Sequence, residues 1–505
     1  MDKDLLSIQQ ARDLAVAARD AQRQFLAASQ AEVDRVCAAM VEAVASAAER
    51  LGRMAAEETG YGVPEHKTLK NLLASKVLWD AIRATPTVGV VRHDAQRKLY
   101  DIAWPMGVVA ALTPSTNPTS TAIFKVLIAV KARNGIIVAP HPSAVKCSAE
   151  AVRVMAEAGE RAGMPRGLVA CMTAVSLPGT QELMRHKYVA LILATGGSEM
   201  VRAAHSVGKP AYGVGPGNVP VYVDRSADLR KAAKYIVASK AFDHSVICAT
   251  EQAVVADAPI AEQLAELMQA EGAYFVTPDE AAALGRLLFT PGPLINPTTV
   301  GKSPQQLAQM AGLRVPATAR ILVARLSKVG REEPLSAEKL TTVLGWYAAD
   351  GWEAGCERCI ELINYGGRGH SLVIHAQDDT VIMRFGLEKP VFRILVNTMG
   401  TLGAVGMTTG VTPSMTLGPG GIGGAITGDN IGVQHMFNVK RLVYETTPPP
   451  AAALAPGSTD DPTQLRTGAA VPANGYGAAA GANGEAVKID EIVRRVLAEL
   501  KGAGY

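Results

Sequence analysis

Residues 107–118 read Gly107-Val108-Val109-Ala110-Ala111-Leu112-Thr113-Pro114-Ser115-Thr116-Asn117-Pro118, a short apolar run that passes directly into a polar one. The first half has the composition of a strand buried on both faces, and the second half supplies a loop that leads into a helix. The same order of strand, loop and helix recurs at residues 135–162, 168–171 and 189–198. Repeated units of this kind predict a doubly wound parallel sheet, with ligands bound outside the carboxyl ends of its strands.

The segments around these units extend the pattern. Apolar residues at helical spacing predict two helices within the first sixty residues, which Gly60 ends. Residues 88–104 predict a hairpin, which either pairs with another subunit or is a simple surface hairpin. Strands and helices alternate again after Cys248 to about residue 430 and predict a second α/β domain, and residues 431–445 predict one more extended strand.

The composition changes abruptly after Glu445. Residues 446–486 number 41 and include 12 Ala, 6 Pro and 6 Gly, which predicts a flexible linker. In residues 487–505, one helical stripe collects the apolar side chains Ile489, Ile492, Val493, Val496, Leu497 and Leu500. A tethered helix needs a surface for such a stripe, so we predict that it docks into a groove of a partner protein. The alternative is that it docks back on the rest of this chain.

Composition and charge exclude several classes of protein. The chain has 505 residues, 48% of them hydrophobic and 19% charged, and its net charge of +3 gives no electrostatic case for nucleic acid or an anionic membrane. It contains no apolar run long enough for a transmembrane helix, and Met1-Asp2-Lys3-Asp4 is unlike a secretory signal. Six scattered cysteines do not form a disulfide framework, so we expect a reducing, cytoplasmic compartment.

One cysteine lies in a setting that suits a nucleophile. Cys248 stands between the apolar pair Val246-Ile247 and the polar run Thr250-Glu251-Gln252. A reactive thiol needs nearby donors or a cation and partial exposure at the end of an element. The alternative is a buried, inert thiol.

The remaining nucleotide and metal signals are weaker. No GxGxxG follows the first strand, and Gly301-Lys302-Ser303 lacks the upstream glycine of a P-loop. The glycine run 418–424 either wraps a ligand or only turns, whereas residues 195–198 follow a buried strand and are placed to meet a pyrophosphate. Cys356 and Cys359 form a lone CxxC on a predicted helix, 353–364, and we predict no metal site.

Five segments together resemble a known family. Residues 114–125, 213–220, 242–252, 336–340 and 366–370 are similar, in this order, to segments of the CoA-acylating aldehyde dehydrogenases. The resemblance runs from about residue 5 to 445 and extends to the aldehyde half of bifunctional aldehyde–alcohol dehydrogenases. It implies an aldehyde dehydrogenase-like α/β fold with two doubly wound domains and a homo-oligomer, either a dimer or a tetramer.

The resemblance also implies a division of the chain. Residues 1–242 would form the NAD-binding domain, which includes the oligomerisation hairpin at 88–104. Residues 243–430 would form the catalytic domain, and the strand at 431–445 would return to the hairpin.

Matching positions imply roles for individual residues. Cys248 would attack the aldehyde carbonyl, and Asn117 with the backbone N–H of Cys248 would hold the oxyanion. Glu338 would bind the nicotinamide ribose of NAD, and His141 and Pro142 would lie at its adenosine end. The other positions that match the cofactor site are Thr113, Pro114, Thr195, Gly196, Gly197, Gly215 and Leu417. Each has an alternative: Asn117 caps a helix, Glu338 forms a surface ion pair, and the glycines only make turns.

An absence indicates the acyl acceptor. Hydrolytic aldehyde dehydrogenases carry a Glu-Leu-Gly-Gly stretch whose glutamate activates water, and here the matching stretch, Gly215-Pro216-Gly217-Asn218, has no carboxylate. Coenzyme A is therefore the expected acceptor, and His370 resembles a histidine of the acylating group that would manage the thiol proton. A structural histidine in the turn is the alternative.

The alternative functions for the chain are a hydrolytic enzyme that releases a free acid, and an adaptor whose role lies in its tail.

The tail resembles the encapsulation peptides of bacterial microcompartment enzymes. This resemblance implies shell proteins as partners of residues 487–505 and a location in the microcompartment lumen. Small residues near the expected site suggest a short-chain aldehyde of two to four carbons.

Overall fold

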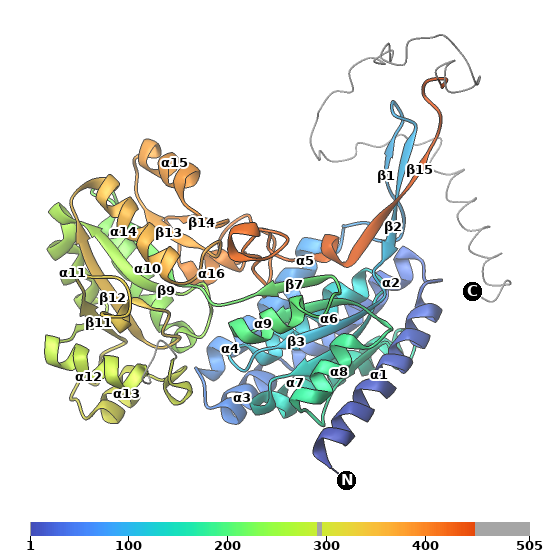
Figure 1. Cartoon of the computed structure of the whole chain (residues 1–505), viewed down its shortest axis with the longest axis horizontal. Coiled ribbons are helices and arrows are strands. Elements are labelled where there is room, and N and C mark those ends of the chain that lie inside the picture. Colours follow the sequence, from blue (N-terminus) through green and yellow to red (C-terminus); the bar gives the residue numbers. More distant parts are fainter. Residues whose placement is uncertain (1, 290–294, 450–505) are drawn as a thin grey trace.

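The computed structural model of this protein describes residues 2–289 and 295–449. Two α/β lobes lie side by side, and a narrow arm projects from one of them (Figure 1). The predicted fold class is confirmed. Most of the linker predicted at 446–486, and the whole helix predicted at 487–505, lie outside the described residues.

The first lobe is built on a five-stranded parallel sheet of order β5-β4-β3-β6-β7. Its strands are β3 (Val108–Thr113), β4 (Gly135–Pro140), β5 (Val169–Cys171), β6 (Val189–Thr195) and β7 (Ala211–Val214). Its helices are α1 (Lys3–Phe25), α2 (Gln30–Ser46), α3 (Ala48–Thr59), α4 (Pro64–Leu72), α5 (Leu78–Ile82), α6 (Pro118–Lys131), α7 (Val145–Arg161), α8 (Leu177–Arg185) and α9 (Ser198–His205). Every residue of β3, β4 and α6 is buried, which explains why the two strands are almost wholly apolar. The helix α6 also buries five polar side chains, those of Thr119, Ser120, Thr121, Lys125 and Lys131.

The amino-terminal prediction of two helices is wrong, because α2 and α3 are separate helices joined at Ala47. No glycine or proline marks this break in the sequence. It follows from tertiary packing, since α3 turns to bury Leu51 and Ala55 against its neighbours. Gly60 ends α3 in the left-handed conformation with a φ of 69°, as predicted.

The second lobe is built on a seven-stranded parallel sheet of order β10-β11-β12-β9-β8-β13-β14. Its strands are β8 (Val219–Val223), β9 (Glu251–Asp257), β10 (Ala273–Phe275), β11 (Ile321–Arg325), β12 (Val343–Ala349), β13 (Leu372–His375) and β14 (Ile394–Val396). Its helices are α10 (Leu229–Ala241), α11 (Ala261–Ala270), α12 (Pro278–Leu288), α13 (Pro304–Ala311), α14 (Gly351–Tyr365), α15 (Asp379–Glu388) and α16 (Gly400–Ala404).

The predicted domain boundary at residues 242 and 243 needs correction. The chain passes from the first sheet to the second between β7 and β8, at residues 215–218, because β8 pairs with β9 and β13. The apolar run of β8 has the same composition as the strands of the first lobe. Composition therefore could not assign it to a sheet.

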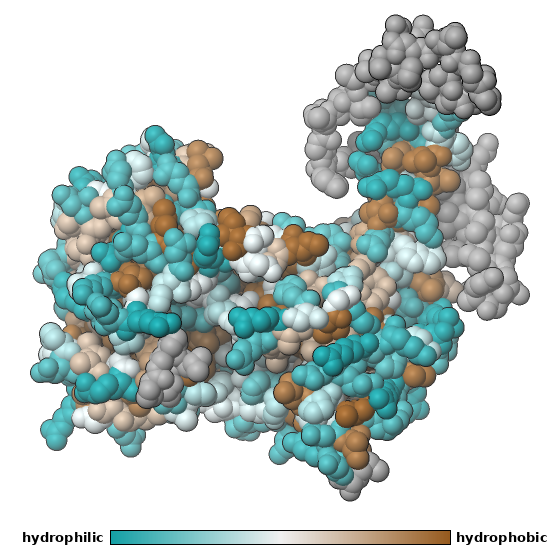
Figure 2. Space-filling model, in the orientation of Figure 1, coloured by the Kyte–Doolittle hydropathy of each residue, from teal (hydrophilic) through white to brown (hydrophobic). Residues whose placement is uncertain are grey.

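The arm is a three-stranded antiparallel sheet of order β1-β2-β15. The predicted hairpin forms β1 (Gly89–Asp94) and β2 (Leu99–Pro105), and the later extended segment forms β15 (Phe437–Val443) on its outer edge. Figure 2 shows apolar side chains on this projection. Its exposed large apolar residues are Trp104, Val439, Leu442, Val443 and Tyr444.

Among residues 2–289 and 295–449, no helix has both the length and the hydropathy that crossing a bilayer requires.

Candidate active site

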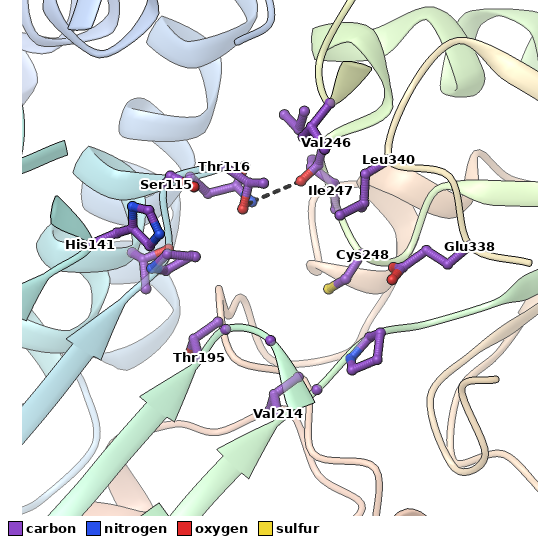
Figure 3. A pocket seen from close by; sticks show the side chains of 18 of the residues that line it. Ser115, Thr116, His141, Thr195, Val214, Val246, Ile247, Cys248, Glu338 and Leu340 are labelled. Atoms are coloured by element: carbon purple, nitrogen blue, oxygen red, sulfur yellow. Dashed lines mark hydrogen bonds between the residues drawn. The ribbon is translucent and has the colours of Figure 1, made fainter. Parts of the chain in front are cut away.

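A cavity of about 430 Å³ lies between the two lobes. The carboxyl ends of β3, β6 and β7 bring Asn117, Thr195 and Gly215 to one side of it, and the segment before β9 brings Cys248 to the other. Figure 3 shows the side chains of Cys248 and Glu338 on one side of this space, opposite His141 and Thr195. The strand ends therefore meet a ligand site, as parallel α/β sheets do.

Cys248 is the one cysteine among the residues that line the cavity within the described ranges, and it is partly buried. Burial, together with the negative charge of Glu338, raises the pKa of its thiol to about 12. The positive charge of Arg393 and the local backbone amides lower the pKa again, but they do not outweigh burial. At neutral pH the resting group is the thiol, so its proton must leave as the nucleophile reacts.

Asn117 is at the amino-terminal cap position of α6, but its side chain makes no capping hydrogen bond. The amide nitrogen Nδ2 donates instead to the carbonyl of Val246 at 3.0 Å and to the hydroxyl of Thr116 at 3.2 Å. The carbonyl Oδ1 accepts a hydrogen bond from Lys70 at 2.5 Å. The amide thus faces the Cys248 segment, and the alternative of a helix cap is wrong.

Glu338 points into the same cavity from the second lobe (Figure 3). Its Oε1 accepts a hydrogen bond from the backbone N–H of Gly217 at 3.0 Å, and burial raises its pKa to about 7. The residue is partly buried and bonded to backbone, so the alternative of a surface ion pair is wrong. Where Glu338 is ionised, near and above neutral pH, its negative charge raises the pKa of the Cys248 thiol.

Replacing Glu338 with glutamine should make Cys248 easier to alkylate. Removal of a negative charge lowers the thiol pKa, so at pH 8.5 the Glu338→Gln variant should react with iodoacetamide about threefold to tenfold faster than the wild type. The difference should shrink at pH 6, where Glu338 of the wild type is protonated. Glu332→Gln, on the same loop but exposed and paired with Lys328, is the matched control. Equal rates for wild type and Glu338→Gln at pH 8.5 would contradict this electrostatic coupling.

The structure brings together most of the residues predicted to hold the cofactor. Those that line the cavity are Pro114, His141, Thr195, Gly196, Gly197, Gly215, Glu338 and Leu417. A Cβ placed on Gly197 or Gly215 would meet no atom within 4 Å, so open space adjoins both backbones. Together with the Thr195 hydroxyl and the Glu338 carboxylate, this space suits a nucleotide with ribose hydroxyls. Thr113 is fully buried at the end of β3 and Pro142 is exposed, and neither lines the cavity.

His370 is placed differently from the expectation. It is buried and does not line the cavity. Its ring packs against Gly217: a Cβ built on Gly217 would lie 2.9 Å from the His370 ring and 2.6 Å from the Cys248 carbonyl oxygen. Burial and the positive charge of Arg393 lower its pKa to about 3. A histidine that manages the thiol proton was expected to have a pKa near neutrality, and burial together with the Arg393 charge is the reason for the difference.

Sequence reasoning missed Arg393 and Lys70, which do not line the cavity but contact residues of the site, His370 and Asn117. Arg393 donates to the carbonyls of His370 at 2.8 Å and Gly418 at 2.7 Å and lowers the Cys248 pKa. Lys70 is buried on α4 and contacts Asn117. Lys67 and Lys70 share a helix face at i, i+3 spacing, but nothing in the local sequence signals that this face is buried.

Comparison with known proteins agrees with this geometry. The model of the aldehyde dehydrogenase family matches residues 5–302. Aldehyde-alcohol dehydrogenase 2 of Entamoeba histolytica is 40% identical over 401 residues, which are 78% of this chain and 46% of that protein. The chain thus spans about half the length of the aldehyde–alcohol dehydrogenases that it matches.

Other relatives match over nearly their whole length. Succinate-semialdehyde dehydrogenase (acetylating) of Clostridium kluyveri is 36% identical, across 86% of this chain and 95% of that protein. The crystal structure of an acetylating aldehyde dehydrogenase from Geobacillus thermoglucosidasius is 47% identical, with a TM-score of 0.88 over 89% of this chain and 99% of that one.

Two more solved structures are similar at lower identity. A propionaldehyde dehydrogenase of Rhodopseudomonas palustris, described with bound CoA and an acylated cysteine, is 27% identical with a TM-score of 0.78 over 86% of this chain and 97% of that one. A propionaldehyde dehydrogenase from a Clostridium phytofermentans fucose utilisation microcompartment is 30% identical with a TM-score of 0.78 over 85% of this chain and 96% of that one. This chain therefore belongs to the aldehyde dehydrogenase family, and within it to the acylating group.

Proposed function

We propose that this chain oxidises a short-chain aldehyde to an acyl-CoA, with NAD as oxidant and through a thioester on Cys248. The observation that carries the proposal is the meeting of Cys248 and Asn117 at a cavity with one carboxylate among its described lining residues, Glu338. That carboxylate is bonded to the N–H of Gly217, and residues 215–218 supply no second one. The site thus has a thiol nucleophile, and its one carboxylate is held through Oε1 by the Gly217 N–H at the position assigned to the nicotinamide ribose.

The first step forms a carbon–sulfur bond. The Cys248 thiol releases its proton to solvent and the sulfur attacks the carbonyl carbon, while the carbonyl electron pair moves to oxygen. The oxyanion then accepts hydrogen bonds from the Asn117 amide and the backbone N–H of Cys248, and the Thr116 hydroxyl gives up its longer contact with Asn117.

The thiohemiacetal then loses a hydride and becomes a thioester. Thr195, Gly197, Gly215 and Glu338 would hold a nicotinamide cofactor, which supplies the hydride acceptor when bound. The hydrogen bond from Gly217 fixes the Glu338 carboxylate at the edge of the cavity for this purpose.

Transfer to coenzyme A frees the enzyme. The CoA thiol loses its proton as its sulfur attacks the thioester carbon, the bond to Cys248 breaks, and the released cysteine sulfur takes up that proton. The solved relative with bound CoA and an acylated cysteine supports this order of events. The proposed role of His370 is to accept a hydrogen bond from the CoA thiol. Its buried Nε2 has no hydrogen-bond partner among the described residues, and its low pKa makes it a hydrogen-bond acceptor more than a strong base.

The acceptor is tested by leaving out coenzyme A. NADH formation from acetaldehyde, propionaldehyde and butyraldehyde should depend on coenzyme A beyond one turnover, and the product should be the acyl-CoA by mass spectrometry. The same panel run with NADP measures the cofactor preference. Sustained turnover without coenzyme A, with the free acid as the product, would favour the hydrolytic alternative.

The tail predicts delivery to a microcompartment. The support is the amphipathic pattern of residues 487–505 and the microcompartment origin of one solved relative. Deleting residues 446–505 should leave activity in solution unchanged and should abolish co-purification with shell proteins, measured by pull-down. Loss of activity or of the oligomer on truncation would favour docking of the tail on its own enzyme.

The arm is the proposed contact between subunits. Its outer strand β15 has six exposed residues out of seven, and Leu442 and Val443 are 47% and 61% exposed. An edge strand with apolar side chains favours pairing with another chain. Leu442→Glu with Val443→Asp should shift the molecular mass measured by light scattering from a dimer or tetramer toward the monomer. An unchanged mass would rule out the arm as the contact.

A further inference from the structure

A buried charge cluster lies between α4 and the turn that leads to Cys248. It consists of Asp243, whose side chain is fully buried, and of Lys67 and Lys70, each 2% exposed. Lys67 is 3.2 Å from the Asp243 carboxylate, and Lys70 contacts the same oxygen. Within the described part of the chain, two ammonium groups thus share one carboxylate, and the cluster carries a net positive charge.

The turn that contains Asp243 has an unusual backbone. Asp243, His244 and Ser245 follow one another with φ values of 49°, 49° and 68°. Left-handed conformations of residues other than glycine are unfavourable and persist only where the surroundings enforce them. This turn ends three residues before the nucleophile, so its conformation determines where Cys248 lies.

The start of α4 enforces the turn through the same aspartate. Asp243 Oδ1 accepts the backbone N–H of Val63 at 2.7 Å, and the backbone N–H of Asp243 donates to His66 Nδ1 at 2.9 Å. Gly62, with a φ of 73°, lets the chain approach so closely that a Cβ there would collide with the Asp243 carboxylate. The two lysines outweigh the effect of burial and lower the Asp243 pKa, so the carboxylate stays charged.

The two lysines differ in what else they contact. Lys67 donates to the backbone carbonyl of Thr116 at 3.2 Å. Lys70 donates to the side-chain oxygen of Asn117 at 2.5 Å, and the other end of that amide donates to the carbonyl of Val246 at 3.0 Å. An ammonium group has donors only, so it can bind the oxygen of the amide and not its nitrogen. Lys70 therefore determines that the N–H groups of Asn117 face the Cys248 segment.

We infer that Lys70, held in place by Asp243, is a positioning residue that orients and polarises the Asn117 amide for the oxyanion. This role rests on the proposed function of Asn117. A cation on the amide oxygen strengthens the N–H groups as donors, and it does so before the substrate arrives. Burial lowers the Lys70 pKa to about 8, so the ammonium form is present at neutral pH.

The two lysines provide a matched pair of variants. Lys70→Met should reduce kcat for aldehyde oxidation about 10²-fold with little change in KM, since misplacement of one catalytic group by about an ångström has an effect of this size. Lys67→Met removes a cation from the same carboxylate but leaves the Asn117 contact, so its loss in kcat should be at least tenfold smaller. Each variant retains one lysine to neutralise Asp243, which favours folding, and thermal unfolding measured beside the kinetics checks it.

A double-mutant cycle with Asn117→Ala separates positioning from a structural role. If Lys70 acts through Asn117, then Asn117→Ala with Lys70→Met should have the same kcat as Asn117→Ala alone. Independent, multiplying losses would overturn the inference, as would equal losses in Lys70→Met and Lys67→Met. If the wild-type enzyme reduces NAD but makes no acyl-CoA, only the proposal that coenzyme A is the acceptor is refuted. The inference about Lys70 stands in that case, because it concerns the rate of aldehyde oxidation. Wild-type enzyme that oxidises no aldehyde would refute both.

Discussion

The Cys248→Ala variant should lose at least about 10⁴-fold in kcat for aldehyde oxidation, with its thermal unfolding temperature close to that of the wild type. The reason is that covalent catalysis divides a difficult reaction into two easier steps, and alanine cannot form the bond that both steps share. The cysteine is partly buried at the cavity, so removal of its sulfur opens little new space in the core. Stopped-flow measurement of NADH at saturating aldehyde and coenzyme A gives the value.

A second cysteine serves as the control for this variant. Cys171 is also free and partly exposed, but it lies at the end of β5 and does not line the cavity. Cys171→Ala should therefore keep kcat within about twofold of the wild type. Substantial aldehyde oxidation by Cys248→Ala would contradict the assigned chemistry.

Loss of the Asn117 amide should have the next largest effect. A single preorganised donor to an oxyanion contributes about 2.7–4 kcal/mol, so Asn117→Ala should lower kcat about 10²-fold to 10³-fold. KM for the aldehyde should change little, because the negative charge on oxygen develops only as the sulfur attacks. Steady-state kinetics with one aldehyde at fixed coenzyme A separates the two constants.

An isosteric variant distinguishes a donor from a structural role. Asn117→Asp keeps the shape of the side chain and its contact with Lys70, but it has no N–H to donate and adds a negative charge beside the oxyanion. We expect it to lose at least as much activity as Asn117→Ala, and thermal unfolding measured beside the kinetics reports the cost of the lost hydrogen bond to the Val246 carbonyl. Retention of near wild-type kcat by Asn117→Asp would mean that Asn117 only supports the loop.

The fold could be predicted from sequence where single strands carry their own signal. The strands β3, β4 and β6 are apolar along nearly their whole length, and the loops that follow them are polar, so both their type and their ligand-binding end were predictable. Sequence did not predict the lobe to which β8 belongs, because that depends on pairing with β9 and β13 and not on the strand's own residues. The break between α2 and α3 was missed for the same reason, since packing causes it and no residue marks it.

The candidate site divides in the same way. Cys248, Asn117 and Glu338 stand in recognisable segments, and the structure brings all three to one cavity. The cluster of Lys70 and Asp243 joins residues 173 positions apart, and lysines on a helix ordinarily face solvent. The low pKa of His370 also depends on burial, which its glycine-rich segment does not reveal.

Direct detection of the acyl-enzyme tests the central claim most sharply. The wild type is incubated with propionaldehyde and NAD without coenzyme A, quenched with acid, digested and analysed by mass spectrometry. The peptide that contains Cys248 should carry one propionyl group, and coenzyme A added before the quench should remove this group and yield propionyl-CoA. A propionyl group on another residue, its absence from the protein, or its loss to water as fast as to coenzyme A would contradict the account.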